Sequence, residues 1–218
     1  MLTQFQIEIQ KIISKVISGS EFALAGAGAL ISQGLIDRLT NDLDYFSTRS
    51  EDVSEITPKV IEALKQSGMN FEIRQESKTF VRFFVERNDQ SLEVDFGLDA
   101  RLFPTQSGEY SPVLSTRELA VDKALAIFGR AAARDFVDFD ALTQYFDLEQ
   151  ILPLAIAKDQ GFSTKLFAEA TRQFERLPRD EFHISESEYL RLRSAVSEWR
   201  SRALELSRDI GKNMGIDI

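Results

Sequence analysis

The hydrophobic pattern of this 218-residue chain changes near residue 112, and this change limits the possible folds more than any other feature. Before residue 112, short segments alternate between polar and apolar residues, as half-buried strands do, with helical segments between them. After it, apolar residues recur at helical spacing. The pattern predicts an α+β fold, with a mixed sheet and flanking helices in residues 1–112 and a C-terminal helical bundle in residues 113–218.

The expected elements follow from periodicity and from cap and turn residues. We expect helices over residues 5–17, 26–34 and 58–67, and strands over residues 21–25, 41–46, 71–73, 80–87 and 91–96. Thr57 and Pro58 predict the start of the third helix as N-cap and first-turn proline. The last two strands form a hairpin across residues 88–90, and residues 97–112 are expected to be a loop. Ser185 and Glu188 have the spacing of a capping box.

The composition removes several kinds of catalytic site. Cysteine is absent, which excludes disulfides, thiolate nucleophiles and Cys-based metal sites. His183 is the single histidine of the sequence, which leaves little basis for a Ser-His-Asp triad or a His-rich metal site. We expect this residue to lie on the surface.

The charge pattern favours a site for cations. The net charge is −9, and all of it falls in residues 1–160. Such a chain is a poor general nucleic-acid binder but suits a site that gathers carboxylates around divalent ions. Residues 1–20 lack the apolar core of a signal peptide, and no apolar stretch approaches the ~20 residues needed to span a bilayer. We therefore expect a cytoplasmic location and no membrane partner.

Asp42-Leu43-Asp44 is the most informative short motif. Residues two apart on a strand project from the same face, so two carboxylates are held close together. Hard oxygen ligands of this kind suit Mg²⁺ or Mn²⁺. Asp95, on another strand, is placed to complete a cluster able to hold two ions about 3.5 to 4 Å apart. The alternative is a solvated strand face.

A turn of small residues lies sixteen residues before Asp42, where a strand meets a helix. It consists of Gly26, Ala27 and Gly28. Amides at a helix N-terminus bind phosphate, and small side chains let the phosphate approach. The alternative is a tight packing corner between strand and helix. The spacing fits neither a P-loop nor a dinucleotide-binding fingerprint.

Four segments together resemble the successive motifs of the AbiEii/AbiGii toxin family, which belongs to the DNA polymerase beta type nucleotidyltransferases. They are residues 22–30, 38–46, 92–96 and 122–138. The resemblance covers roughly residues 20–145 and implies a nucleotidyltransferase-like fold. It also implies a bacterial source, a cognate antitoxin as partner and, for some members, transfer of nucleotides to tRNA.

The resemblance also implies roles for individual residues. Asp42, Asp44 and Asp95 are implied as catalytic metal ligands for Mg²⁺ or Mn²⁺, and the turn at Gly26 as the site of the nucleoside triphosphate. The candidate nucleotide-binding residues are Gly26, Ala27, Gly28, Arg38, Lys123, Arg130 and Arg134, and Lys123 is also counted as catalytic. Family members carry a hydroxyl residue in the turn, where this chain has Ala27.

The cations of the segment 122–138 have two possible environments. On a helix, Lys123 and Arg130 fall on one stripe, opposite the apolar residues of that helix. They face either water or a cleft that holds phosphates. Arg134, Asp135 and Asp138 begin the next helix, either as a salt-bridge network that holds Lys123 or as an ordinary helix start.

These observations lead to two main functional hypotheses. The first is a Mg²⁺-dependent nucleotidyltransferase that moves a nucleotide to an acceptor hydroxyl on tRNA or protein, as the toxin of a toxin-antitoxin or phage-defence system. The second is a catalytically impaired protein of the same fold that binds nucleotide or a partner. A third, an α+β scaffold with solvent-facing carboxylates, predicts that Asp42 and Asp44 can be replaced without effect.

Overall fold

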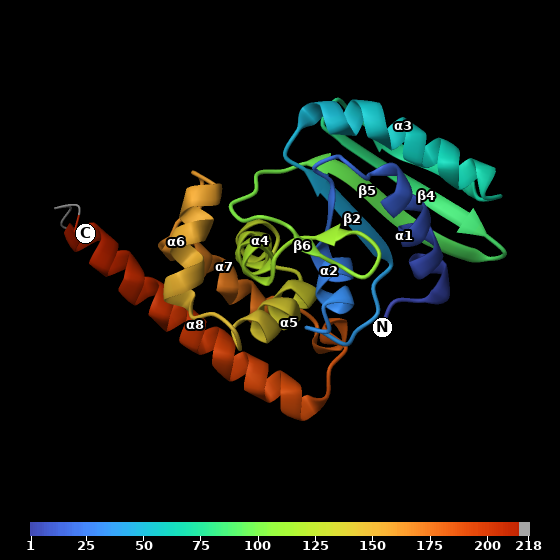
Figure 1. The fold of residues 1–218 in the computed structure, drawn as a ribbon. Coiled ribbons are helices and arrows are strands. Elements are labelled where there is room, and N and C mark those ends of the chain that lie inside the picture. The colour runs from blue at the N-terminus through green and yellow to red at the C-terminus, as the bar shows by residue number, and fades with distance from the viewer. Residues whose placement is uncertain (214–218) are drawn as a thin grey trace. The chain divides into compact units, whose positions relative to one another are not determined.

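The computed structural model describes residues 1–213, and the side chains of residues 1–209. The chain divides into two compact units, residues 1–115 and 116–218, compared with the predicted boundary at residue 112. The first unit is a mixed sheet with helices, and the second is entirely helical within the described residues (Figure 1). The fold is therefore α+β, as the sequence predicts.

The first unit contains a seven-stranded sheet in the order β3-β4-β5-β2-β1-β7-β6. The strands are β1 (Ala23–Ala25), β2 (Asp42–Ser47), β3 (Asn70–Glu76), β4 (Phe80–Arg87), β5 (Gln90–Leu98), β6 (Gln106–Ser107) and β7 (Pro112–Val113). The β2/β5 and β1/β7 pairs are parallel and the other pairs are antiparallel. The short strands β6 and β7 lie in the segment that we expected to be a loop.

Three helices accompany the sheet: α1 (Gln4–Val16), α2 (Gly26–Ser32) and α3 (Ser50–Gln66). Figure 1 shows α1 and α3 over the same face of the sheet. That face is apolar, because Leu43, Val94 and Phe96 alternate with the polar residues of β2 and β5 and are buried. The ring of Phe96 stacks on Tyr45 with 5.2 Å between centroids and meets Phe22 edge-on at 4.9 Å. Aromatic pairs of this kind stabilise the core and leave the opposite face for polar groups.

Helix α3 corrects the prediction for this segment. It begins at Ser50, eight residues before the expected start, and Pro58 lies inside it. Its buried residues include Val53 and Thr57 in the added turns and Val60 in the predicted part, which lie on one face. Pro58 is exposed, and so is Ser54, whose carbonyl loses its helical hydrogen bond to the proline. Burial of the apolar face outweighs the cost of the proline.

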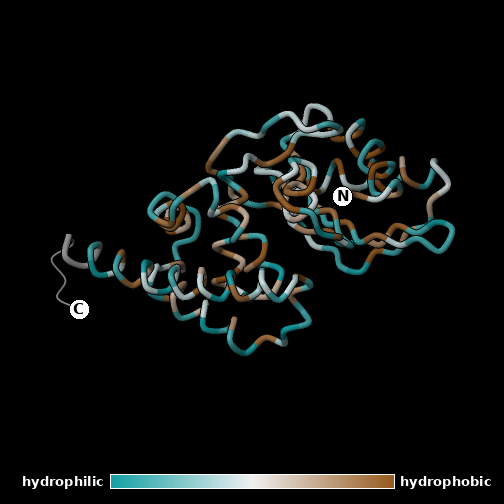
Figure 2. Tube along the Cα trace, turned by 90° about the horizontal axis from the view of Figure 1, so that it is seen from below, coloured by the Kyte–Doolittle hydropathy of each residue, from teal (hydrophilic) through white to brown (hydrophobic). Residues whose placement is uncertain are grey.

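The second unit consists of five α-helices and two short 3₁₀ helices within the described residues. They are α4 (Thr116–Gly129), α5 (Ala133–Leu142), α6 (Leu148–Lys158), α7 (Thr164–Ala170), η1 (Thr171–Arg176), η2 (Arg179–Phe182) and α8 (Glu186–Asn213). The predicted capping box opens α8: Ser185 N donates to Glu188 Oε2 at 2.8 Å, and Glu188 N to Ser185 Oγ at 3.3 Å. Trp199 packs α8 against Phe139 of α5, with 5.0 Å between ring centroids. Apolar positions recur along these helices in Figure 2.

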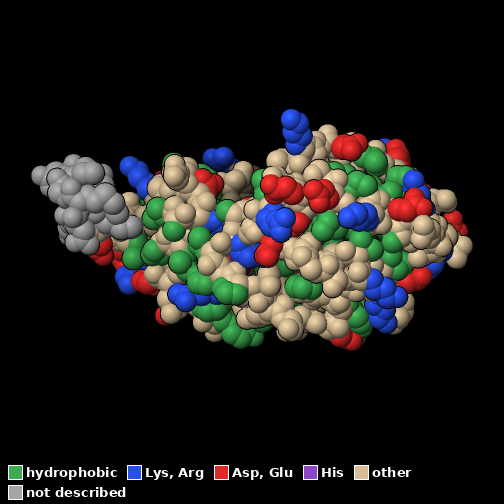
Figure 3. All heavy atoms as spheres, turned by 45° about the horizontal axis from the view of Figure 1, so that its top comes forward, with side chains coloured by type: hydrophobic (Ala, Val, Ile, Leu, Met, Phe, Trp, Pro, Cys, Tyr) green, Lys and Arg blue, Asp and Glu red, His purple; other side chains and the backbone are tan. Residues whose placement is uncertain are grey.

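The surface carries charged side chains of both signs (Figure 3), and His183 lies on it. Acidic and basic side chains are interspersed on the face seen in Figure 3. His183 is exposed after η2, as predicted. Among the described residues, no helix is both long and apolar enough to cross a membrane.

Candidate active site

The paired aspartates lie beside a second pair of carboxylates. Strands β2 and β5 run parallel, and their register pairs Asp42 with Glu93 and Asp44 with Asp95. Because side chains alternate along each strand, these four carboxylates share the face opposite the aromatic core. Asp42 and Asp44 are half-buried, whereas Asp95 is only 4% exposed. The structure therefore brings the three predicted aspartates onto one face and adds Glu93, which the predicted site did not include.

Asp42 is positioned from helix α1. The side-chain amide of Gln6 donates to the carbonyl of Thr40 at 2.7 Å, and both residues are buried. The hydroxyl of Thr40 in turn donates to Asp42 Oδ1. Two hydrogen bonds in series therefore connect α1 to the first aspartate and restrict its rotamer.

The turn at Gly26 lies directly against Asp44. Gly26 has φ +57°, and a β-carbon added to it would fall 1.9 Å from Asp44 Oδ2. Only glycine combines this backbone conformation with so close an approach. The backbone conformation and the contact with Asp44 therefore account for a glycine at position 26 whether or not the turn binds phosphate.

The next residues of the turn form a tight packing corner between strand and helix. The sequence allowed this corner as the alternative to a phosphate site. A β-carbon on Gly28 would lie 3.0 Å from Leu43 Cδ2 and 3.3 Å from Leu24 Cδ1. Ala27 is buried at 6% exposure. Gly28 thus allows the seven-residue helix α2 to pack closely on β1 and β2.

Arg82 of β4 is the functional candidate that sequence reasoning missed. Its Nε donates to Asp95 Oδ1 at 2.8 Å and its Nη2 to Asp95 Oδ2 at 2.6 Å, a two-pronged contact. Glu93 Oε1 lies 3.3 Å from the same Nε. The hydrogen bonds to Asp95 raise the pKa of Arg82, burial opposes this, and the charges of Asp95, Glu93 and Asp44 add to it. The guanidinium is therefore a permanently charged cation among the carboxylates.

The donor set suits a divalent metal ion. Carboxylate oxygens on one sheet face are the ligands that Mg²⁺ and Mn²⁺ prefer. In the arrangement described for residues 1–209, no group of three or more His, Cys, Asp or Glu side chains is placed to hold an ion. Both oxygens of Asp95 are bound to Arg82 in this arrangement. The chemistry of the residues fits a metal ion, and Arg82 is the cation in contact with Asp95.

Lys123, in the second unit, does not face water. Its side chain is buried, and Nζ lies 2.7 Å from Asp138 Oδ2 and 3.7 Å from Asp135 Oδ1. Both aspartates are fully buried. This is the salt-bridge network that the sequence offered as one interpretation, and it makes Lys123 a buried link between α4 and α5. Of the two environments that the sequence allowed, exposure to water does not hold for Lys123, because α4 is buried on several sides.

Asp135 is the centre of this network. Arg130 donates to both of its oxygens at 2.8 Å, and the amide of Ala132 donates to Oδ2 at 3.2 Å. Burial raises the pKa of Asp135, but the hydrogen bonds from Arg130 and the charges of Lys123 and Arg130 outweigh it and lower the pKa below its ordinary value. The carboxylate is therefore ionised and holds the start of α5.

The remaining nucleotide-binding candidates lie on partly exposed positions. Arg130 has a side chain 54% exposed even though it binds Asp135. Arg134 is exposed in the first turn of α5. Arg38 lies in the loop between α2 and β2, where Nη1 donates to the carbonyl of Leu39 at 2.9 Å.

The mixed sheet with its flanking helices is a nucleotidyltransferase fold. Solved structures of low identity share it. JHP933 from Helicobacter pylori is 16% identical, with a TM-score of 0.57 over 98% of this chain and 100% of that one. MenT4, a nucleotidyltransferase toxin from Mycobacterium tuberculosis, is 16% identical, with a TM-score of 0.52 over 81% of this chain and 64% of that one. The antibiotic-resistance factor ANT(2'')-Ia is 13% identical, with a TM-score of 0.51 over 72% of this chain and 92% of that one.

The family follows from the sequence itself. The model of the family described as "Nucleotidyl transferase AbiEii toxin, Type IV TA system" matches residues 9–210. The chain therefore belongs to the AbiEii nucleotidyltransferase toxin family, which confirms the resemblance and the enzyme class inferred from the motifs. This family implies a nucleoside triphosphate substrate and an antitoxin partner. The comparison with curated proteins gives no match.

Proposed function

We propose that this chain transfers a nucleotide from a nucleoside triphosphate to an acceptor hydroxyl, on tRNA or on a protein, in a reaction that depends on Mg²⁺ or Mn²⁺. In the cell it is the toxin of a bacterial toxin-antitoxin or phage-defence pair. The observation that supports this most directly is the placement of Asp42 and Asp44 beside Asp95 on one sheet face, with Gly26 against Asp44.

The chain contributes positioning and charge to this reaction. Asp42, Asp44 and Asp95 would hold the divalent ions, which when bound neutralise phosphate charge and favour the ionised acceptor hydroxyl. The Gly26 turn, Lys123, Arg38, Arg130 and Arg134 are the proposed contacts of the triphosphate. The acceptor oxygen forms its bond to the α-phosphorus, the bond to pyrophosphate breaks, and no covalent bond to the protein is required.

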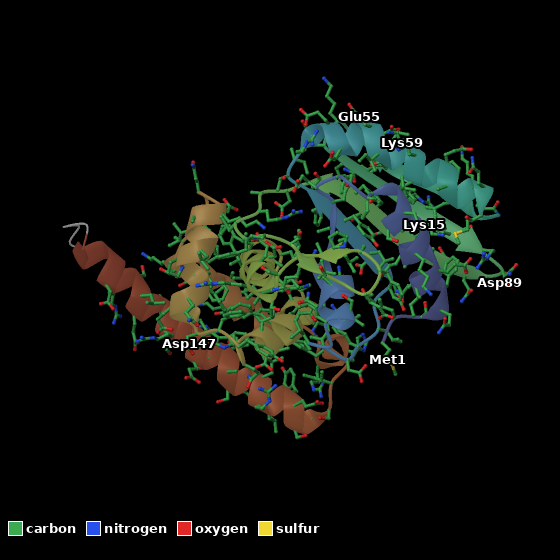
Figure 4. The ribbon with its side chains drawn as sticks, in the orientation of Figure 1. Met1, Lys15, Glu55, Lys59, Asp89 and Asp147 are labelled. Carbon is green, nitrogen blue, oxygen red and sulfur yellow. The ribbon has the colours of Figure 1, made fainter. Side chains whose placement is uncertain are left out.

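A transfer assay tests this proposal. Purified protein is incubated with Mg²⁺, total bacterial tRNA and each α-phosphate-labelled nucleoside triphosphate in turn. The Asp42→Asn/Asp44→Asn double variant is run beside it. Glu55→Gln is the matched control, because Glu55 is an exposed acidic residue on α3 that projects away from the sheet (Figure 4).

We expect label on RNA or protein with the wild type and with Glu55→Gln, and none with the double variant. The labelled species then identifies both nucleotide and acceptor. No label in any sample, together with Mg²⁺-dependent nucleotide binding that the double variant lacks, would contradict the transfer reaction. It would favour the nucleotide-binding protein of the same fold, and Ala27 would then be the residue to replace by serine.

A further inference from the structure

The contact with Arg82 engages both oxygens of Asp95, a carboxylate proposed to hold a divalent ion. Arg82 is directly opposite Asp95 in the antiparallel register of β4 and β5, so the two side chains share the carboxylate face. Both oxygens of Asp95 accept a hydrogen bond from the guanidinium, at 2.8 and 2.6 Å. Such a planar contact uses one in-plane lone pair on each oxygen of the carboxylate, and these are the lone pairs that a chelated metal ion would use. Arg82 and a divalent ion therefore compete for Asp95 in space and in charge.

Asp95 depends on having one cation or the other. Its side chain is only 6% exposed, and an ionised carboxylate buried to this degree is costly without a positive partner. In the described arrangement Arg82 is that partner. Arg82 is also the more exposed member of the pair, since its side chain is 37% exposed.

Arg82 has another carboxylate beside it when it leaves Asp95. Glu93 Oε1 already lies 3.3 Å from its Nε, and the guanidinium carbon lies 5.6 Å from the ring centre of Phe80. A rotation of the long side chain would exchange Asp95 for Glu93, so the guanidinium would keep a carboxylate partner.

We propose that Arg82 is the resident counter-ion of Asp95 and a gate on metal loading: a divalent ion binds at Asp95 only after the guanidinium has moved away. The proposal rests on the proposed function, because it concerns the same carboxylates. Arg82 acts on metal binding through Asp95, so it is a positioning residue rather than a catalytic one.

Binding of Mn²⁺ without nucleotide tests the gate independently of catalysis. Free Mn²⁺ is followed by electron paramagnetic resonance during titration of the wild type, Arg82→Met and Arg74→Met. Arg74 is the matched control, because it lies on the neighbouring strand β3, pairs with Glu72 at 2.8 Å and stacks over Phe84. We expect Arg82→Met to bind Mn²⁺ about tenfold tighter or more, and Arg74→Met to bind as the wild type does.

The other outcomes are also decisive. An Arg82→Met affinity equal to or weaker than that of the wild type, with binding that Asp44→Asn removes, overturns the gate but leaves the metal site in place. Absence of Mn²⁺ binding in every variant overturns both. If Arg82→Met does not fold, as judged by circular dichroism, the Mn²⁺ affinity of Arg82→Lys is measured in its place. Lysine keeps the charge but cannot make the two-pronged contact, so tighter binding supports the gate and unchanged or weaker binding overturns it.

Discussion

Gly26 and Asp44 are in such close contact that a β-carbon on the glycine would lie 1.9 Å from Oδ2 of the aspartate. Gly26 begins α2, and Asp44 is the Cα partner of Ala25, the residue before it. The end of β1 and the second aspartate of β2 are therefore fixed relative to one another. Any side chain at position 26 would displace the proposed metal ligand.

Gly26→Ala is expected to impair both stability and transfer activity. The positive φ costs about 1–2 kcal/mol for alanine. Displacement of Asp44 by about 1 Å would lower activity about a hundredfold. Gly34→Ala is the matched control, because Gly34 has φ +69° and open space around its Cα. Urea unfolding and the transfer assay separate the two effects. Equal activity of the two variants would show that the contact with Asp44 is unimportant.

Thr40→Val is expected to weaken the site while leaving the fold intact. The change removes the hydroxyl that donates to Asp42 Oδ1 and keeps the shape of the side chain. Partners that orient a metal ligand are typically worth about 10-fold to 100-fold in metal affinity or activity. Mn²⁺ affinity and transfer rate are the measurements, and Thr79→Val, at an exposed turn, is the control. Wild-type values for Thr40→Val would mean that Asp42 is oriented by other groups.

Lys123→Met is expected to destabilise the protein by about 3–5 kcal/mol, because it leaves buried carboxylates without their cation. Adding Asp138→Asn removes one of these charges and should recover part of the loss. Lys59→Met, at an exposed position of α3, is the control (Figure 4). Urea unfolding measures the stabilities.

The same variants test the nucleotide contact proposed for Lys123. If Lys123 also binds the triphosphate, the Lys123→Met/Asp138→Asn protein regains stability but not nucleotide affinity. Recovery of both would limit Lys123 to a structural role.

The lowered pKa of Asp135 predicts a loss of stability in acid. Because the folded pKa lies below the ordinary value of 3.8, the unfolded chain binds the proton first as the pH falls. The stabilisation is fully present above pH 3.8 and is lost as the pH falls toward the folded pKa. Asp135→Asn should therefore lose less stability than the wild type as the pH falls below 3.8.

Urea unfolding at a series of pH values measures this difference. Asp147→Asn, at the exposed N-cap of α6, is the control and should follow the wild type (Figure 4). Parallel stability curves for Asp135→Asn and the wild type would contradict the assignment.

The residue of β4 that lies opposite Asp95 depends on the length of the hairpin turn, and the observed turn is one residue shorter than the predicted one. The predicted hairpin turn of three residues, 88–90, would set Phe83 opposite Asp95. The observed turn has two residues, Asn88 and Asp89, with φ of 50° and 62°, and Asp89 lies at the tip of the hairpin (Figure 4). Asparagine and aspartate tolerate these values, which suit a type I′ turn. That turn places Arg82 opposite Asp95, so the signal was present in the two turn residues.

The sequence alone was sufficient for features that depend on local spacing. Alternation along β2 and β5 separated Asp42, Asp44 and Asp95 from the apolar core, and Ser185 and Glu188 marked the start of α8. These predictions succeeded because a strand period or a helix cap is defined within a few residues. The motif spacing also led to the family.

Tertiary structure decided the features that depend on what each residue meets across the fold. Helix α3 continues through Pro58 because its added turns bury an apolar face, and Lys123 is buried because two aspartates of α5 surround it. Arg82 is the cation of Asp95 because sheet register makes them neighbours. Burial and charge pairing join residues that are distant along the chain, and local spacing carries no information about such partners.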